Sequence, residues 1–581
     1  MTIHAGDKTF VPESASDAFL GLLAARGIDY FFANGGTDFA PIAESYARGE
    51  AYGWRLPTAV IAPHENLGVA MAHGHTMVSG RPQAMMVHVG VGTANLLNGA
   101  INASRQRVPM LLCAGRTPLT EGGEGTALPG ARNNFIHWAQ EHFDQGGMLR
   151  EFVKWDYELR HPEQLETVVD RALAIAMSEP RGPVYLTLPR EILGAPARGA
   201  PGARPVQVPA TPPAADPGAL DEVASLLAQA QSPLLITADA GRSASAARAL
   251  ARLADELAIP VIHYRPRYFA LSTEHPMHAG WDPHALLPQA DLVLVVDCDV
   301  PWIPVQGAPS PRARVVHIGP DPLYARYPLR GFRTDIALTG TVDATLEALR
   351  ARALERSPHD PRRAARHAAT GARSAQTRAA ARAGVGRAPQ ALTGKWLSAC
   401  LNSVLPADAI VVNEYPLVLE EMTITEPGRY FAASPAGGLG WGLGAALGAK
   451  LAAPERTVVC TLGDGAYMFG NPTPGHFVSE SMRLPVLFVI FNNARWAAVH
   501  RATLGMYPQG HAAKMSRPPI ATLEPAPRFE KVVEASGGYG ERVESVAEVV
   551  PALERALRAV RDEGRQALLN VCLEASYVKT S

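Results

Sequence analysis

The sequence predicts an α/β protein built from three doubly wound parallel sheets. Short apolar runs alternate with segments of helical spacing in three successive blocks, which is the pattern of parallel strands connected by helices. The blocks are separated by two segments of biased composition that are typical of linkers. A length of 581 residues, which suggests about three or four domains, agrees with this division.

The first block covers residues 1–193. Its predicted strands are 84–89, 109–114 and 184–188, with a helix over 96–107. The N-terminal sequence lacks a basic start followed by an apolar run, so we do not expect a secretion signal. Residues 194–218, which are rich in proline and alanine, are predicted to form a linker.

The second block, residues 219–350, repeats the pattern. Its predicted strands are 233–237, 291–296 and 313–318. Residues 351–390 follow and are rich in alanine and arginine, so we predict a helical or mobile linker there. Its basic character could indicate nucleic-acid binding, but a solvated helix face is the favoured interpretation.

The third block covers residues 391–581. Its predicted strands are 409–412, 457–462, 486–491 and 567–571. The first and third blocks each place a glycine-rich turn beside a long helix, which suggests an ancient duplication.

The composition indicates a cytoplasmic protein without a nucleic-acid or membrane partner. The formal net charge is −1, which gives no bulk attraction to nucleic acid or to membrane surfaces. No run of about 18 apolar residues is present, so no transmembrane helix is expected. The five cysteines lie far apart and mostly in apolar surroundings, which indicates buried thiols and not disulfides or a metal cluster.

Polar residues follow two predicted strands of the third block. Asp464 lies between two glycines after strand 457–462, and Asn492 and Asn493 follow strand 486–491. In open parallel sheets, ligands bind at the carboxyl ends of the strands. A carboxylate and an amide oxygen suit Mg²⁺ or Ca²⁺, so these residues could hold a metal that clamps a diphosphate. The alternative is a pair of simple turns, because Gly, Asp and Asn are common turn residues.

Three further stretches could carry chemistry. Residues 434–450, SPAGGLGWGLGAALGAK, place a glycine-rich turn before a helix of small residues, but they match neither the dinucleotide nor the P-loop pattern. Glu65 begins a helical pattern, where a carboxylate can simply interact with the helix dipole. His88 ends a predicted strand, where a lone histidine is more often structural than catalytic.

In this order the four pieces resemble the thiamine-diphosphate-dependent 2-oxo acid decarboxylase and acetohydroxyacid synthase superfamily. The most specific element is Gly463-Asp464-Gly465, followed after 26 residues by Asn492-Asn493. The resemblance covers nearly the whole chain and is greatest to benzoylformate decarboxylase, through VHVGVGTAN, FVKWDYE, GPVYLTLP and AGGLGWGLGAALGAKLAAPER. It implies a pyrimidine-binding domain in residues 1–193, a central domain in 219–350 and a diphosphate-binding domain in 391–581.

The resemblance also implies roles for individual residues. The implied catalytic residues are Glu65, whose counterpart contacts the aminopyrimidine ring of thiamine diphosphate, and two active-site histidines, His88 and His275. The implied Mg²⁺ ligands are Asp464, Asn493 and the carbonyl of Arg495. The implied cofactor-binding residues are Gly437, Gly438, Leu439, Gly463, Asp464, Gly465, Ala466, Asn493, Arg495 and Trp496. The implied substrate-pocket residues are Thr37, Ala498, Val499, Ala502 and His476.

The chain departs from the family at two places. The segment after Asn413-Glu414 reads Tyr415-Pro416-Leu417, where relatives usually offer hydroxyl groups to the diphosphate. Ala502 replaces a large aromatic residue, which suggests a roomier or differently shaped substrate pocket.

The implied reaction is decarboxylation of a 2-oxo acid through an enamine intermediate on thiamine diphosphate. The enamine is either protonated, which releases an aldehyde, or attacks a second carbonyl, which gives a 2-hydroxy ketone. An acetolactate synthase is the nearest alternative, although residues 295–307 lack the usual FAD-binding pattern, which makes FAD doubtful. A non-catalytic cofactor-binding protein is a remote alternative. The family further implies a homodimer, in which Glu65 of one chain faces the diphosphate domain of another, and usually a homotetramer.

Overall fold

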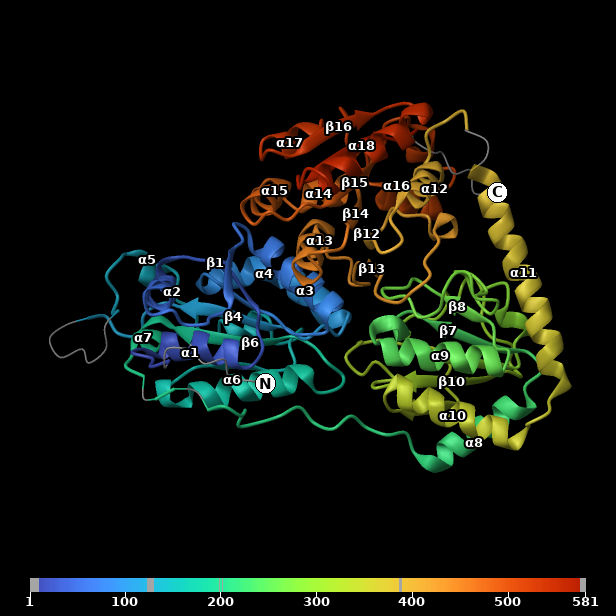
Figure 1. Cartoon of the computed structure of the whole chain (residues 1–581), viewed down its shortest axis with the longest axis horizontal. Helices are drawn as coiled ribbons and strands as arrows, with labels where there is room; N and C mark the ends of the chain where they lie inside the picture. The colour runs from blue at the N-terminus through green and yellow to red at the C-terminus, as the bar shows by residue number, and fades with distance from the viewer. Residues whose placement is uncertain (1–9, 123–129, 198, 201, 386–388, 575–581) are drawn as a thin grey trace.

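The computed structural model describes residues 10–122, 130–197, 199–200, 202–385 and 389–574 (Figure 1). Residues 198, 201 and 386–388 of the two predicted linkers lie outside these ranges. The chain forms three separate sheets, and every pairing between named strands is parallel. The predicted fold class, an α/β protein with three parallel sheets, is therefore confirmed.

The first sheet has six strands in the order β2-β1-β3-β4-β6-β5. Its strands are β1 (Tyr30–Asn34), β2 (Thr58–Ile61), β3 (Ala84–Val87), β4 (Leu111–Arg116), β5 (Asp156–Glu158) and β6 (Val184–Pro189). Its helices are α1 (Ala15–Ala25), η1 (Thr37–Phe39), α2 (Ala40–Tyr52), α3 (Glu65–Ser79), α4 (Val89–Arg105), α5 (Ile136–Ala139), α6 (Leu165–Met177) and α7 (Arg190–Gly194).

The central sheet has five strands in the order β11-β10-β9-β7-β8. Its strands are β7 (Pro233–Thr237), β8 (Val261–His263), β9 (Leu292–Val296), β10 (Arg314–Gly319) and β11 (Ile336–Thr339). Its helices are α8 (Pro217–Gln229), α9 (Ala244–Glu256) and α10 (Val342–Arg356).

The third sheet has six strands in the order β13-β12-β14-β15-β17-β16, which is the strand order of the first sheet repeated. Its strands are β12 (Ile410–Glu414), β13 (Tyr430–Ala432), β14 (Val458–Gly463), β15 (Leu487–Asn492), β16 (Tyr539–Val543) and β17 (Ala567–Cys572). Its helices are α12 (Gly394–Val404), η6 (Leu419–Glu421), α13 (Trp441–Ala452), α14 (Asp464–Phe469), α15 (Pro472–Ser481), α16 (Ala497–Met506), α17 (Glu530–Glu534) and α18 (Val549–Arg561). The identical order agrees with the duplication that the sequence suggests.

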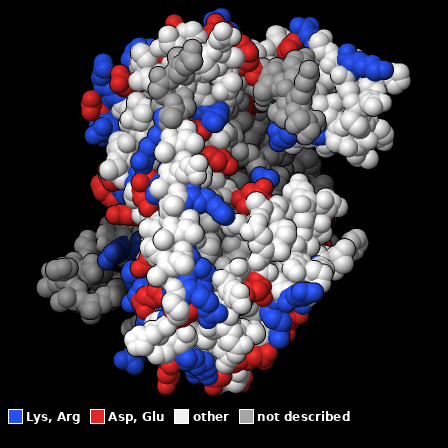
Figure 2. Space-filling view, turned by 90° about the vertical axis from the view of Figure 1, so that its right-hand side faces the viewer, with Lys and Arg blue, Asp and Glu red and all other residues white. Residues whose placement is uncertain are grey.

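The basic segment between the second and third sheets forms a long helix, α11 (Pro361–Val385), at one side of the molecule (Figure 1). Its arginines bind the central domain: Arg362 donates to the carbonyl of Ala228 over 2.9 Å, and Arg366 to that of Leu257 over 2.8 Å. These carbonyls lie at the ends of helices α8 and α9, where a cation is favourable. Figure 2 shows basic and acidic side chains interspersed on this face of the molecule. Part of the positive charge of α11 is thus neutralised by contacts within the chain.

The first and third domains join through two helices, α3 and α13. Small residues let the two backbones approach closely, because a Cβ at Gly74 would lie 2.1 Å from the carbonyl oxygen of Ala445. A Cβ at Gly448 would similarly lie 2.0 Å from the carbonyl oxygen of Met71. One buried apolar cluster contains residues of both domains. The small-residue helix that the sequence shows after Gly440 is therefore a domain-packing surface.

Two further expectations concern the whole chain. Within the described ranges, no helix has both the length and the apolar character needed to cross a bilayer. All five cysteines are free thiols, and four of them are buried, as their apolar surroundings in the sequence predict.

Candidate active site

The two side chains predicted to bind a metal meet at the carboxyl edge of the third sheet. Asp464 begins α14 directly after β14, and Asn493 follows the neighbouring strand β15. Asp464 Oδ2 and Asn493 Oδ1 both accept a hydrogen bond from the backbone N–H of Arg495, over 3.2 and 3.0 Å. The two oxygens therefore converge on one point.

Asp464 is a buried carboxylate with no ion-pair partner among the described residues. Its side chain accepts from the N–H of Gly465 over 2.8 Å, but burial raises its pKa to about 6. No group of three or more His, Cys, Asp or Glu side chains that could hold a metal gathers anywhere in the described ranges. A metal here would take one carboxylate, one amide oxygen and oxygens of backbone or ligand, a hard donor set that suits Mg²⁺.

The residues around Asp464 leave one side of it open. A Cβ at Gly463 would meet nothing within 4 Å, whereas one at Gly465 would lie 2.4 Å from the Trp496 ring. Ala466 follows in the first turn of α14 and is buried. The backbone at Gly463 can therefore be approached closely by a ligand, and Trp496 closes the opposite side.

A glycine-rich loop, residues 437–440, packs against the end of α14. Gly437 and Gly440 have φ angles of +73° and +77°, which other residues adopt only with strain. Glu414, at the end of β12, holds the loop by accepting from the N–H groups of Gly440 and Gly442 over 2.8 and 2.6 Å. Burial raises the pKa of Glu414 to about 7. Sequence analysis did not predict a role for Glu414. Its position at the end of β12 places its carboxylate beside the glycine-rich loop.

Glu65 belongs to the part of the first domain that contacts the same loop, since the next residue, Asn66, donates to the carbonyl of Gly440 over 3.4 Å. It is the first residue of α3 and only 7% exposed. Asn95 donates to its Oε2 over 3.1 Å, and its Oε1 accepts no hydrogen bond among the described residues. Nearby, Asn98 donates to the carbonyl of Leu439 over 3.2 Å, and Asn102 to that of Gly438 over 2.8 Å. The fold therefore brings the Glu65 end and the Asp464 end of the predicted site to one loop.

Both ends of the site belong to the same chain in this structure. The resemblance, in contrast, puts Glu65 opposite the diphosphate domain of a partner chain. The predicted homodimer and homotetramer therefore stay predictions.

His88 lies at the carboxyl end of β3 with a carboxylate beside it. Its Nδ1 is 2.6 Å from Oδ1 of Asp38, and its Nε2 is 3.3 Å from Nε2 of Gln140. Asp38 is 3% exposed, and its hydrogen bond raises the pKa of His88. Gly36 makes room for the ring, because a Cβ there would lie 2.3 Å from it. Sequence analysis missed Asp38, which lies 50 residues before His88.

Thr37 lies beside a second histidine of the first domain. Its Oγ1 is 3.4 Å from Nε2 of His137. The Nδ1 of His137 accepts from the N–H of Asn133 over 3.2 Å, so Nε2 carries the proton of the neutral ring. Burial lowers the pKa of His137, which favours that neutral form. Thr37, Asp38, His88 and His137 thus form one polar cluster at the edge of the first sheet.

The structure does not bring the other predicted residues into this cluster. His476 is fully buried, with its ring nitrogens 2.7 Å from the Tyr467 hydroxyl and 2.8 Å from Gln566 Oε1, so it has an internal role and no place in a substrate pocket. His275 lies in the central domain, where its Nδ1 accepts from the N–H of Met277 over 3.1 Å. The predicted pocket residues of α16, where no residue is buried, are Ala498, Val499 and Ala502.

Family models of the thiamine pyrophosphate enzymes match most of the chain. The N-terminal TPP binding domain matches residues 13–148, the central domain 220–349 and the C-terminal TPP binding domain 415–571. The chain belongs to the thiamine pyrophosphate enzyme family. The three matches fall on the three sheets in the same order, and the two TPP binding domains carry Glu65 and Asp464 respectively.

Among the relatives of this thiamine pyrophosphate enzyme are decarboxylases and acetolactate synthases. Benzoylformate decarboxylase of Pseudomonas aeruginosa is 28% identical over 82% of this chain and 85% of its own. The probable 2-ketoarginine decarboxylase AruI of the same organism is 29% identical over 94% and 91%. The acetolactate synthase large subunit IlvG of Mycobacterium tuberculosis is 28% identical over 95% and 94%. The solved 4-hydroxybenzoylformate decarboxylase of Rhodococcus jostii shares the fold, with a TM-score of 0.74, 24% identity and coverage of 97% and 100%.

The residues of this thiamine pyrophosphate enzyme fit the cofactor at both ends. Asp464 is a buried carboxylate that needs a cation, and the open backbone at Gly463 leaves room for a diphosphate. Glu65 offers a carboxylate oxygen, Oε1, that no described residue uses. Tyr415 also brings a hydroxyl near the loop, since its oxygen lies 3.6 Å from the Cβ position of Gly437.

In the central domain of this thiamine pyrophosphate enzyme, buried charged side chains lie where a dinucleotide would be expected. A dinucleotide would bind at the carboxyl ends of strands such as β7 and β9. There, Arg267 binds Asp239 and Asp299, each over 2.9 Å, and Arg107 binds Asp297. All five side chains are at most 8% exposed. Buried ion pairs thus occupy this edge of the central sheet, and whether FAD binds there stays a matter for experiment.

Proposed function

We propose that the chain is a thiamine-diphosphate- and Mg²⁺-dependent enzyme that decarboxylates 2-oxo acids. One observation carries this proposal: the loop of residues 437–440 accepts hydrogen bonds from α4, the helix whose Asn95 binds Glu65, and it also packs against the end of α14, the helix that Asp464 begins. Neither a metal-only site nor a simple strand-end turn accounts for both contacts. The similarity to benzoylformate decarboxylase and to the probable 2-ketoarginine decarboxylase supports the same class.

Thiamine diphosphate, when bound, supplies the carbanion chemistry by which a 2-oxo acid loses carbon dioxide. Glu65 would share a proton with the aminopyrimidine ring through its available Oε1. Asp464, Asn493 and the carbonyl of Arg495 would hold Mg²⁺. The loop of residues 437–440, with Leu439 in it, would orient the cofactor between these two ends.

His88 is proposed to move a proton at the substrate, with Asp38 positioning its ring. We expect His88→Ala to lower kcat/KM by roughly a hundredfold, the lower range for a lost acid–base group. Asp38→Asn keeps an acceptor for the His88 ring but removes the negative charge that strengthens this hydrogen bond and raises the His88 pKa, so the limb of the pH–rate profile that belongs to His88 should move to lower pH. The profile is measured for wild type and both variants. An unchanged rate in His88→Ala would indicate that His88 has only a structural role. A pH–rate profile whose limb does not move in Asp38→Asn would indicate the same.

The proposal is tested with a panel of pyruvate, branched and aromatic 2-oxo acids. Carbon dioxide release is followed with and without thiamine diphosphate and Mg²⁺, and the products are identified. We expect cofactor-dependent release from at least one acid. An aldehyde product would indicate decarboxylation alone, and a 2-hydroxy ketone would indicate carboligation. Cofactor binding without release from any acid would favour a non-catalytic binding protein.

An acetolactate synthase without FAD is the second candidate. It is favoured by the similarity to the acetolactate synthase large subunit IlvG, which extends over nearly the whole of both chains. In the panel it would appear as acetolactate formed from pyruvate. Flavin absorbance of the purified protein would contradict the FAD-free assignment of either candidate.

A further inference from the structure

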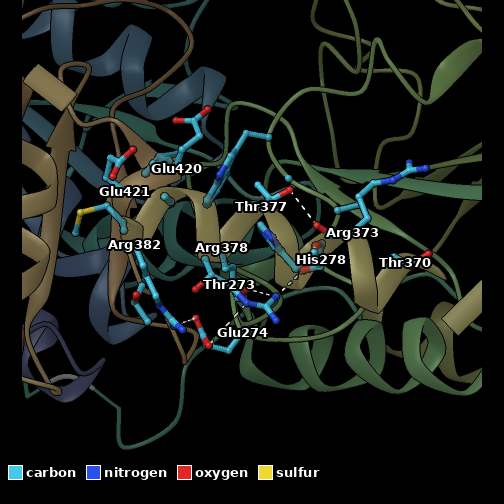
Figure 3. Close-up of a pocket in the computed structure, with 18 of the residues that line it drawn as sticks. Thr273, Glu274, His278, Thr370, Arg373, Thr377, Arg378, Arg382, Glu420 and Glu421 are labelled. Atoms are coloured by element: carbon cyan, nitrogen blue, oxygen red, sulfur yellow. Dashed lines mark hydrogen bonds and ion pairs between the residues drawn. The ribbon is translucent and has the colours of Figure 1, made fainter. Parts of the chain in front are cut away.

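A pocket of about 200 Å³ lies where the central domain, α11 and the third domain meet (Figure 3). Its walls come from the loop after β8, from one face of α11 and from η6 with the residues that follow it. No residue of the candidate active site lines it. The pocket is therefore separate from the proposed cofactor site.

His278 is the buried polar group of this pocket. It is 6% exposed, and its Nε2 has no hydrogen-bond partner among the described residues. The ring packs against Trp281, with centroids 5.0 Å apart, and stacks with His263 at 5.2 Å. Burial lowers the pKa of His278 to about 4, so the imidazole is neutral at pH 7 and can donate one hydrogen bond. A buried nitrogen without a partner beside a pocket indicates a binding group that a ligand can satisfy.

The charges at the rim are mostly paired within the protein. Glu274 binds Arg382 over 2.8 Å and Arg378 at 3.9 Å, and Glu421 binds Lys395 at 3.4 Å. Arg373 and Glu420, both exposed, have no ion-pair partner among the described residues, so each could meet a charged ligand of the opposite sign. Figure 3 shows both among the residues that line the pocket, and they come from different elements, Arg373 from α11 and Glu420 from η6. The neutral His278 inside the pocket can serve either as donor to an anion or as acceptor.

The apolar part of the lining is aromatic and branched. Trp281, Leu286, Leu419 and Met422 line the pocket together with alanines of α11. The volume is below that of typical sites for drug-sized molecules, so the ligand has to be small. An arginine guanidinium binds a carboxylate in a two-pronged geometry, which favours an anionic over a cationic head group at this rim.

We propose that this pocket binds a small aromatic carboxylate, with its ring against Trp281 and Leu286. His278 Nε2 would donate to the carboxylate, and Arg373 would supply positive charge at the rim. The site is independent of the proposed catalytic function, because it uses none of the catalytic residues.

The test is a ¹⁹F NMR titration of 4-fluorobenzoate into the protein saturated with thiamine diphosphate and Mg²⁺. We expect His278→Phe, which keeps the aromatic packing, to raise the Kd about tenfold, the effect of losing one buried hydrogen bond. Arg373→Gln should raise it about threefold, whereas Arg363→Gln, a matched change on α11 outside the pocket, should not. His88→Ala should also leave it unchanged, which separates this site from the active site. 4-Fluorobenzamide and 4-fluorobenzylamine should bind more weakly.

Three results would overturn the proposal. They are no binding of the probe, a Kd that changes in His88→Ala but not in His278→Phe, and tighter binding of the benzylamine than of the benzoate. If His278→Phe does not fold, the comparison of Arg373→Gln with Arg363→Gln decides, because neither side chain is buried and both variants should fold.

Discussion

Replacing Glu65 by glutamine is expected to reduce turnover of the preferred 2-oxo acid by about 10²- to 10⁴-fold, the usual contribution of a proton-transferring side chain. Glutamine keeps the shape and can still accept from Asn95 through its amide oxygen. It cannot share a proton with the aminopyrimidine ring as a carboxyl group does. Turnover is measured at saturating thiamine diphosphate and Mg²⁺, so that weaker binding does not mimic weaker catalysis.

The matched control for this change is Glu50→Gln on α2, where the side chain is exposed. It should turn over like the wild type. Circular dichroism and the thermal midpoint of Glu65→Gln should also match the wild type, because the substitution leaves the packing of α3 in place. Near-normal turnover of Glu65→Gln would remove Glu65 from the proposed mechanism.

Replacing Asp464 by asparagine is expected to weaken Mg²⁺-dependent binding of thiamine diphosphate by at least about a hundredfold. Changes in groups that merely support metal ligands already cost about 10–100-fold, and among the residues that the structure describes Asp464 alone brings a carboxylate to this point of the site. The affinity is measured by isothermal titration calorimetry in the presence of Mg²⁺. The exposed Asp562→Asn serves as the matched control and should bind like the wild type.

The same residue predicts a pH dependence of cofactor binding. Without a metal, the pKa of Asp464 is raised to about 6, so protons compete with Mg²⁺ for the carboxylate below that pH. The wild-type affinity should therefore fall as the pH drops through about 6. In Asp464→Asn this competition is absent, so its weak affinity should fall less over that range, where the terminal phosphate of the cofactor still titrates. Equal affinities of the two proteins would contradict a metal site at Asp464.

The sequence predicts every interior strand of the three sheets except β1, and it predicts none of the edge strands. β3, β6, β7, β9 and β15 are wholly buried, so their residues form the continuous apolar runs on which the prediction depends. The edge strands β2 and β11 have mostly exposed or half-buried residues, and no such run marks them. These segments are strands because they pair with the neighbouring strand of the sheet, and their own composition does not predict this.

The candidate site shows a similar contrast. Residues that follow a local sequence pattern could be predicted, whereas residues that only the fold brings together could not. Asp464 and Asn493 can be placed together from sequence because adjacent parallel strands end at one edge. Asp38 could not be found in this way, since only the fold brings it to His88. Glu414 was overlooked because a buried strand-end carboxylate has no pattern of its own. His476 was placed in the pocket by its position near a divergent segment, and only the structure shows its internal hydrogen bonds.

The central claim is that Glu65 and the Asp464 side of the third domain act on one bound thiamine diphosphate. The most direct measurement is the rate at which the thiazolium C2 proton of the bound cofactor exchanges with deuterium, read by acid quench and ¹H NMR. The account predicts fast exchange in the wild type and exchange near the rate of the free cofactor in Glu65→Gln, with the cofactor still bound. Equally fast exchange in the two proteins would contradict it.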